Sequence, residues 1–237
     1  MSKTGFAAVI AALTLPLGVA ACGSSGNSSP STPPRPAANA YIERANFVRT
    51  VDNPWFPLKP GTTLRYRGIK DAAPTVDVVT VTHRTRDILG VPATVVHDSL
   101  YDDKGHVIEE TFDWYAQDKR GNVWYLGEDT KELDAKGNVK SREGSWQTGK
   151  DGAIAGIFMP ANPRVGQSFR QEYYKGQAED HFKILSLGAG RMRTEETTPL
   201  EPDVVDNKYY VRGIGTVREV AVKGPKETNV LVSVKKG

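Results

Sequence analysis

The sequence has few of the residue types and motifs that usually narrow a function. Its 237 residues include one cysteine, Cys22, so an intramolecular disulfide is excluded, and thiolate chemistry can involve no other position. Lys and Arg number 31 against 28 Asp and Glu, and they form no basic stripe, so we expect no nucleic-acid partner. Nucleophile-elbow, zincin and phosphate-loop motifs are absent, and we expect no cofactor.

The N-terminus has the pattern of an export signal. Lys3 is the only charged residue before Cys22, and the uncharged segment 6–21 is shorter than the roughly 20 apolar residues of a bilayer-spanning helix. The segment 19–23 (VAACG) resembles the lipobox of bacterial lipoproteins, in which a peptidase cleaves before a cysteine that becomes acylated. We therefore predict a signal peptide over 1–21 and lipidation of Cys22. The alternative is an ordinary secretory signal with an incidental cysteine.

The segment after Cys22 has the composition of a tether. Residues 23–40 contain no large apolar side chain, their serines and glycines give flexibility, and their prolines give extension. We interpret residues 22–40 as a lipidated cysteine and linker that hold residues 41–237 off a membrane. The expected location is extracytoplasmic, on the outer face of the bacterial cell membrane or on another envelope membrane.

Residues 41–237 read as a single β-rich domain. A short helix is predicted over 41–51, and the prolines that follow it prevent its continuation. Runs rich in β-branched residues with partial alternation occur at 75–86, 93–101, 106–118, 122–126 and 229–234.

A repeated turn motif organises the first half of this domain. The pattern Asp-x-x-Gly recurs at 102–105, 118–121 and 134–137, and each copy predicts a tight turn in which aspartate accepts from the backbone and glycine supplies a positive φ. The turns join predicted strands at 93–101, 106–117, 122–133 and 138–142, with a bulge at Gly127. The predicted fold is mainly β, an antiparallel meander that forms a curved half-barrel or a lipocalin-like barrel.

A second regularity relates the two ends of the domain. The segment 59–65 (KPGTTLR) is similar to 164–170 (RVGQSFR), and each follows an Asn-Pro pair. One interpretation is two pseudo-repeated halves, 53–150 and 160–237. The alternative is coincidence in a short match.

Three longer motifs resemble an uncharacterised family of secreted bacterial proteins and lipoproteins. They are NPWFPLKPG at 53–61, DWYAQDKRGNVWYLGEDT at 113–130 and LEPDVVDNKYY at 200–210. The resemblance implies export and carries no activity or site. The chain departs from the family pattern after Leu187, where it is shorter by about one hairpin.

Two adjacent strands carry the residues from which we predict a ligand site. Alternation along 106–118 gives a polar face containing Asp113 and Tyr115 and an apolar face containing Trp114, with Glu110 as its exception. On the next strand Trp124, Leu126 and Glu128 share one face, and Val123 and Tyr125 share the other. Such aromatic and acidic residues line sites for sugars or acyl chains. The predicted binding residues are Trp114, Tyr115, Trp124, Tyr125 and Glu128, and the alternative is ordinary cross-strand core packing.

Signals for catalysis or metal binding are weaker. A carboxylate-dependent hydrolase would use Glu110, Asp113 and Glu179. Glu179, Asp180 and His181 are the best candidates for a metal cluster, but the histidines are dispersed, so we expect no metal and favour a solvated charge cluster.

Three functions follow as hypotheses. The first is a non-catalytic, membrane-anchored module that binds an amphiphilic or envelope-derived lipid or glycan. The second is a hydrolase of cell-envelope glycans. The third is a structural or assembly partner in the envelope, which would expose an apolar patch.

Overall fold

The computed structural model describes residues 41–237, so the predicted signal peptide, Cys22 and the tether lie outside the described residues. The described chain forms one 15-stranded antiparallel sheet in the order β10-β8-β5-β4-β3-β2-β1-β15-β14-β13-β12-β11-β9, with β6 and β7 paired to β5. The strands are Thr63–Lys70 (β1), Ala73–Ile88 (β2), Val91–Tyr101 (β3), Val107–Gln117 (β4), Val123–Leu133 (β5), Val139–Ser141 (β6), Trp146–Gln147 (β7), Ile154–Met159 (β8), Ser168–Arg170 (β9), Glu172–Tyr173 (β10), His181–Gly188 (β11), Arg191–Thr197 (β12), Val205–Val211 (β13), Gly215–Lys223 (β14) and Thr228–Lys235 (β15).

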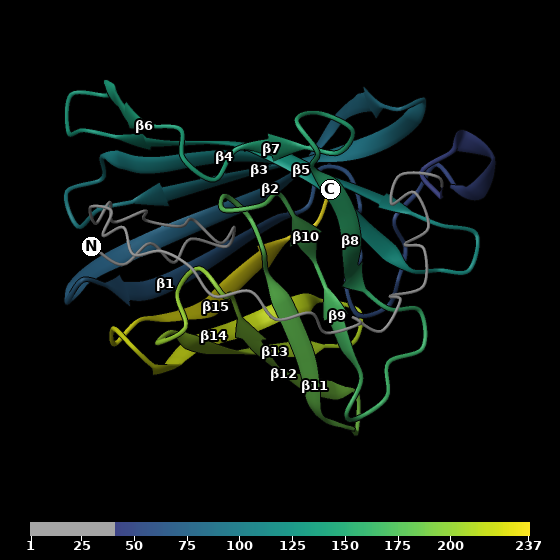
Figure 1. Cartoon of the computed structure of the whole chain (residues 1–237). Coiled ribbons are helices and arrows are strands. Elements are labelled where there is room, and N and C mark those ends of the chain that lie inside the picture. Colours follow the sequence, from purple (N-terminus) through teal and green to yellow (C-terminus); the bar gives the residue numbers. More distant parts are fainter. Residues whose placement is uncertain (1–40) are drawn as a thin grey trace, which may run out of the picture.

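The sheet curls into a nearly closed barrel with one seam, which confirms the predicted fold class. In Figure 1, β2–β5 form the upper wall and β11–β15 the lower wall. The two ends of the sheet are consecutive in the chain: β9 pairs with β11, β10 pairs with β8, and only Gln171 separates them. Gly156 lets β8 approach this seam, because a Cβ at that position would lie 2.2 Å from the carbonyl oxygen of Arg170.

The three predicted turns are confirmed, and they share one hydrogen-bond pattern. In each, the glycine N–H donates to the aspartate carbonyl, and the aspartate Oδ1 accepts from the backbone N–H groups two and four residues later. Gly105, Gly121 and Gly137 have φ of 84°, 90° and 83°. The turns join β3, β4, β5 and β6 in chain order, as the meander requires.

The predicted helix over 41–51 is reduced to a three-residue 3-10 turn, Arg44–Asn46. The segment instead bridges to Asp118 at the end of β4 through Phe47, and Val51 bridges to Leu58 in the loop before β1. Ile42 and Phe47 are buried against the outer face of the upper wall. Tertiary packing therefore overrides a weak local helix preference. No helix among residues 41–237 is long and apolar enough to cross a membrane.

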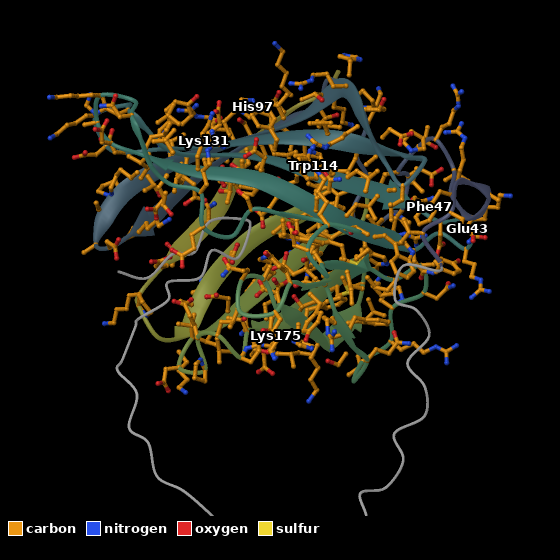
Figure 2. The ribbon with its side chains drawn as sticks, turned by 45° about the horizontal axis from the view of Figure 1, so that its top comes forward. Glu43, Phe47, His97, Trp114, Lys131 and Lys175 are labelled. Atoms are coloured by element: carbon orange, nitrogen blue, oxygen red, sulfur yellow. The ribbon has the colours of Figure 1, made fainter. Side chains whose placement is uncertain are left out.

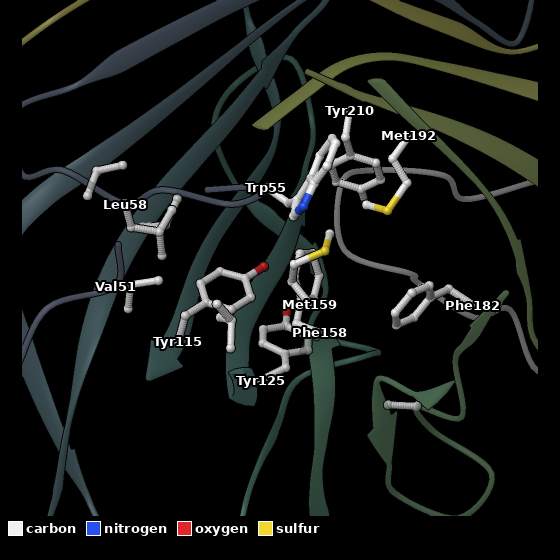
Figure 3. Close-up of a cluster of buried hydrophobic side chains, with 14 of the residues drawn as sticks. Val51, Trp55, Leu58, Tyr115, Tyr125, Phe158, Met159, Phe182, Met192 and Tyr210 are labelled. Atoms are coloured by element: carbon white, nitrogen blue, oxygen red, sulfur yellow. The ribbon is translucent and has the colours of Figure 1, made fainter. Parts of the chain in front are cut away.

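Two apolar clusters lie on opposite faces of the upper wall. The inner one fills one end of the barrel with Trp55, Tyr115, Tyr125, Phe158 and Tyr210 among its members (Figure 3). The outer one contains Trp114 and Leu126 under the N-terminal segment. The inner cluster occupies only part of the lumen, and polar residues line the rest.

Candidate functional site

The polar face of β4 points into the barrel. Glu109, Thr111 and Asp113 are buried there, and their partners are supplied from within the lumen. Thr111 Oγ1 lies 2.7 Å from Thr130 Oγ1, and the Tyr125 hydroxyl donates to Asp113 Oδ1 at 2.6 Å. The interior of this sheet is therefore partly acidic, and the apolar face of β4 is covered from outside.

An acidic cavity lies at the end of the barrel that carries the β1–β2, β3–β4 and β14–β15 connections. Its volume is about 40 Å³, room for one or two water molecules. We call it the acidic compartment. Its carboxyl groups belong to Asp77, Asp98, Glu109, Asp206, Glu219 and Glu227, and its other polar residues include Lys70 and Asn229.

The acidic compartment contains acceptors that have no donor. The Asn229 side-chain amide donates to Asp77 Oδ2 at 2.8 Å, and Lys70 Nζ lies 3.2 Å from Glu109 Oε2. Asn229 Oδ1 and Glu227 Oε1 are buried and have no hydrogen-bond partner. The second donor to the Asp77 carboxylate is the carboxyl group of Asp98. Unsatisfied buried acceptors are costly, so each marks a place where a donor from outside the chain would be stabilised.

Burial holds several of these carboxyl groups partly protonated. It raises the pKa of Glu227 to about 7 against the opposing effect of Lys70. Burial also raises the pKa of Asp206 to about 6 and that of Glu219 to about 8, although Lys208 opposes both shifts. Burial and the neighbouring Asp77 raise the pKa of Asp98 well above its usual range. The compartment therefore gains negative charge as pH rises from about 6 to 8.

An apolar cavity of about 50 Å³ adjoins the acidic compartment inside the barrel. We call it the aromatic compartment. The rings of Phe56, Tyr115 and Phe158 form its wall, with centroids 4.5 to 5.1 Å apart. Most of the remaining lining is aliphatic, at Leu58, Leu64, Val79, Val81 and Val96, and its polar residues include Asp98, Asp113, Lys208 and Thr216. Asp98 lines both compartments, so the lumen changes from acidic to apolar at this residue.

Lys208 is the buried cation beside the aromatic compartment. Its Nζ lies 2.7 Å from Glu196 Oε2 and 3.8 Å from Glu219 Oε1. Burial lowers the pKa of Lys208, but Glu196 and Glu219 outweigh that effect and hold it well above the usual value. Lys208 therefore keeps its positive charge, and the carboxylates of Glu196 and Glu219 on the lower wall neutralise it.

The two tryptophans of the predicted ligand site lie outside the lumen. Trp114 is only 4% exposed because the Arg86 guanidinium covers its ring, 4.0 Å from the centroid. The Trp124 indole N–H donates to Asp118 Oδ2 at 3.0 Å, and its ring stacks on Tyr41. Figure 2 shows Trp114 on the outer side of the upper wall. Both residues pack the outer cluster.

The other three predicted residues face inward, and a bulge explains the grouping. Tyr115 pairs with Tyr125 across β4 and β5, whereas Trp114 pairs with Gly127, so Leu126 is an extra residue on β5. Alternation restarts after Gly127, whose φ is 134°, and Glu128 therefore joins Tyr125 rather than Trp124. Glu128 is 1% exposed, and neither of its carboxylate oxygens has a partner. Burial and Glu172 raise its pKa well above the usual range.

The carboxylates of the hydrolase hypothesis do not converge. Glu110 lies on the outer face, paired with His97 and Lys131. Asp113 is inside the barrel, where burial raises its pKa to about 7. Glu179 accepts from the Gly176 N–H at 2.7 Å, in the turn before β11. The chain thus separates the three groups onto different surfaces.

The metal candidates are also divergent. The Asp180 side chain is buried, with Oδ1 unpartnered, while His181 Nδ1 lies 3.0 Å from the carbonyl oxygen of Glu179. Within residues 41–237 no group of three or more His, Cys, Asp or Glu side chains is arranged to hold a metal ion.

Sequence reasoning missed the acidic compartment. Asp77 stands alone in the β-branched run 75–81, and alternation puts it on the same face as Val79 and Val81. That lone carboxylate on a buried face was the available signal. The sequence around Glu227 and Asn229 contains no such signal, because the pairing of β15 with β1 brings these residues beside Asp77.

Comparisons with known proteins give little guidance. No protein-family profile and no curated protein matches the chain. Two solved structures align with most of it. One is a candidate exported protein with a YmcC-like fold from Bacteroides fragilis, with 14% identity, 81% of this chain and 100% of that chain covered, and a TM-score of 0.43. The other is a candidate lipoprotein from Parabacteroides distasonis, with 9% identity, 80% and 99% covered, and a TM-score of 0.39. Neither carries a function over to this protein.

Proposed function

We propose that this protein is a lipid-anchored extracytoplasmic binding module that holds an amphiphilic, envelope-derived ligand in the barrel lumen. The observation that carries the proposal is the division of the lumen at Asp98 into an acidic and an aromatic compartment. A cavity with one apolar end and a few convergent polar groups suits a molecule with one apolar and one polar end.

The size of the lumen favours a chain-like ligand over a ring. Cavities of about 40 and 50 Å³ hold a few waters, far below the several hundred Å³ of a site that encloses a sugar. A narrow alkyl chain requires the smallest enlargement of these cavities, by movement of lining side chains such as Phe56 and Leu58. The backbone of the loop 54–58 stays in place, because Gly213 N–H donates to Pro54, Leu58 N–H to Val51, and the Trp55 and Phe56 N–H groups to Asn53.

The lipid anchor is proposed from the lipobox-like segment 19–23, since Cys22 lies outside the described residues. Tyr41, the first described residue, lies at the β4–β5 turn, where its ring stacks on Trp124 and its hydroxyl donates to Asp118. Asp113 and Tyr115 near the end of β4 line the aromatic compartment.

Binding of a fluorescent apolar probe tests the proposal. The full chain with Cys22→Ala, which removes the proposed acylation site, is titrated with cis-parinarol, a linear fluorescent polyene alcohol, and we expect saturable binding at one site. Val79→Phe, which fills the aromatic compartment, should weaken binding at least tenfold. Val222→Phe is the control, because Val222 is exposed on the outer surface. Absence of saturable binding, or equal binding by the two variants, would overturn the proposal.

A further inference from the structure

We infer that the acidic compartment binds a primary ammonium group, so the ligand is an amphiphile with a cationic head. This inference rests on the proposed function and specifies the chemical class of the ligand. The head would occupy the acidic compartment, and the chain would pass Asp98 into the aromatic compartment.

The arrangement of unpaired acceptors is the first argument. Asp77 and Glu227 are 2% and 7% exposed, and both line the cavity; Glu227 Oε1 has no hydrogen-bond partner, whereas the Asp77 carboxylate has Asn229 and the carboxyl group of Asp98. Asn229 adds a second unpartnered oxygen, and its donation to Asp77 Oδ2 assigns the amide so that Oδ1 is the free acceptor. A primary ammonium group has three donors and no acceptor. It would supply donors to Glu227 Oε1 and Asn229 Oδ1, which the chain leaves without a partner, and a positive charge to the Asp77 carboxylate.

The balance of charge is the second argument. Six carboxyl groups line the compartment, and Lys70 is the one basic residue among its lining. Lys70 is already engaged with Glu109. An anionic head would meet like charge, and a hydroxyl head would leave the negative charge uncompensated, whereas a cation gains from it at low local dielectric.

Size and ligand geometry exclude two other cations. A volume of about 40 Å³ accepts a group of the size of water, and a quaternary ammonium with three methyl groups is larger and has no donor. A divalent metal needs several converging oxygen ligands. No group of three or more metal-ligating side chains is arranged for this among residues 41–237.

A series of probes with one chain length tests the inference. Octylamine, octanol, octyltrimethylammonium and octanoate compete with cis-parinarol for the Cys22→Ala chain at pH 8, where the amine is charged and most of the compartment is ionised. We expect octylamine to displace the probe at a concentration at least tenfold lower than any of the others. Calcium chloride alone should displace nothing.

Two variants locate the headgroup. Asp77→Asn and Glu227→Gln keep the shape of each side chain, and each should weaken octylamine five- to tenfold while octanol is unchanged. The matched control is Asp103→Asn, an exposed aspartate in the turn at the same end of the barrel. If Asp77→Asn does not fold, Glu227→Gln and the probe series on the parent chain decide the question.

The outcomes separate the two proposals. Equal displacement by octanol and octylamine, or equal loss in Asp103→Asn and Glu227→Gln, overturns the ammonium site and leaves the binding module standing. Tighter binding of octyltrimethylammonium or of calcium also overturns it, in favour of another cation. Failure of every octyl compound to displace the probe, or of the probe to bind, overturns the proposed function and the inference together.

Discussion

Asn229 on β15 reaches across β1 to donate to Asp77 on β2, at 2.8 Å. The strand between them carries Gly68 at this point, paired with Asn229 on one side and Thr75 on the other. A Cβ on Gly68 would lie 3.1 Å from Asn229 Oδ1 and 2.3 Å from the carbonyl oxygen of Thr228. The missing side chain therefore makes room for the bridge, and the bridge fixes how the acidic compartment presents its free oxygens.

Removal of that bridge should destabilise the barrel. Asn229→Ala leaves Asp77 Oδ2 buried without its donor, and we expect a loss of about 1 to 3 kcal/mol in the free energy of unfolding, measured by urea denaturation. Asn138→Ala is the matched control, because Asn138 Nδ2 donates to Asp134 Oδ2 in an exposed turn. Similar losses in the two variants would contradict the role given to the bridge.

Acidification from pH 8 to pH 5 should stabilise the protein. The pKa values of Glu219 and Glu227 are raised by burial to about 8 and about 7, so the folded state holds protons that the unfolded chain has released. Each group then contributes stability that is complete below its unfolded pKa and is lost as pH rises through its folded pKa. After allowance for partial exposure we expect a loss on the order of 2 to 4 kcal/mol between pH 5 and 8, or roughly 5 to 10 °C in melting temperature.

A variant isolates the cause of this pH dependence. Glu219→Gln should make the decline between pH 7 and 8 shallower, because it removes a group whose pKa in the folded state is about 8. Below about pH 4 the trend should reverse, since hydrogen bonds from His106 and Asn138 lower the pKa values of Asp102 and Asp134. A melting temperature that rises steadily from pH 5 to 8 would contradict the raised pKa values of Glu219 and Glu227.

The turns were predictable from sequence because their geometry is local. An aspartate that accepts two backbone N–H groups and a glycine at positive φ are determined by four or five consecutive residues, and the same pattern appears at 102, 118 and 134. The loops at 59–62 and 164–167 are also alike: Thr62 N–H donates to Lys59, and Gln167 N–H donates to Arg164, both at 3.1 Å. The interpretation of two pseudo-repeated halves remains a prediction.

The side chains that line the lumen were harder to predict because they depend on distant pairing. The bulge predicted at Gly127 is confirmed, but the extra residue, Leu126, is fixed by the register of β5 against β4, and this register decides the face of Glu128. The acidic compartment joins β2 to β15 across 152 residues, which no local pattern records. The polar face of β4 was recognisable, but its direction follows from closure of the barrel.

The three turns should differ in how much their aspartates stabilise the protein. Asp118 also accepts from the Trp124 indole at 3.0 Å and from the Tyr41 hydroxyl at 3.3 Å, and it is buried, whereas Asp134 serves only its own exposed turn. We expect Asp118→Ala to cost about 3 to 5 kcal/mol and Asp134→Ala about 1 kcal/mol by urea denaturation. Equal costs would show that the contacts of Asp118 with the N-terminal segment contribute nothing.

Lipidation is tested on Cys22 itself. Cells that express the full chain are fed a palmitate analogue with a clickable tag, and we expect the parent protein to be labelled and to fractionate with membranes. Cys22→Ala should lose the label and be retained as precursor or released. Labelling of the variant at the level of the parent would contradict the lipobox interpretation of residues 19–23.

The assignment of inner and outer faces can be tested by truncating one ring on each. Trp114 packs the outer cluster beneath Arg86, and Phe158 stands in the wall of the aromatic compartment. Alanine at either position leaves a cavity, so each variant should lose about 3 to 5 kcal/mol of unfolding free energy. Binding of cis-parinarol should separate them, because only Phe158 lines the lumen. We expect the affinity to change at least fivefold in Phe158→Ala and to be unchanged in Trp114→Ala, measured below the melting range of both.

Arg86→Ala, which uncovers the ring of Trp114 without opening the core, should cost only about 0.5 to 1 kcal/mol and leave binding unchanged. Weaker binding in Trp114→Ala with no change in Phe158→Ala would place the ligand on the outer face and overturn the lumen as the site.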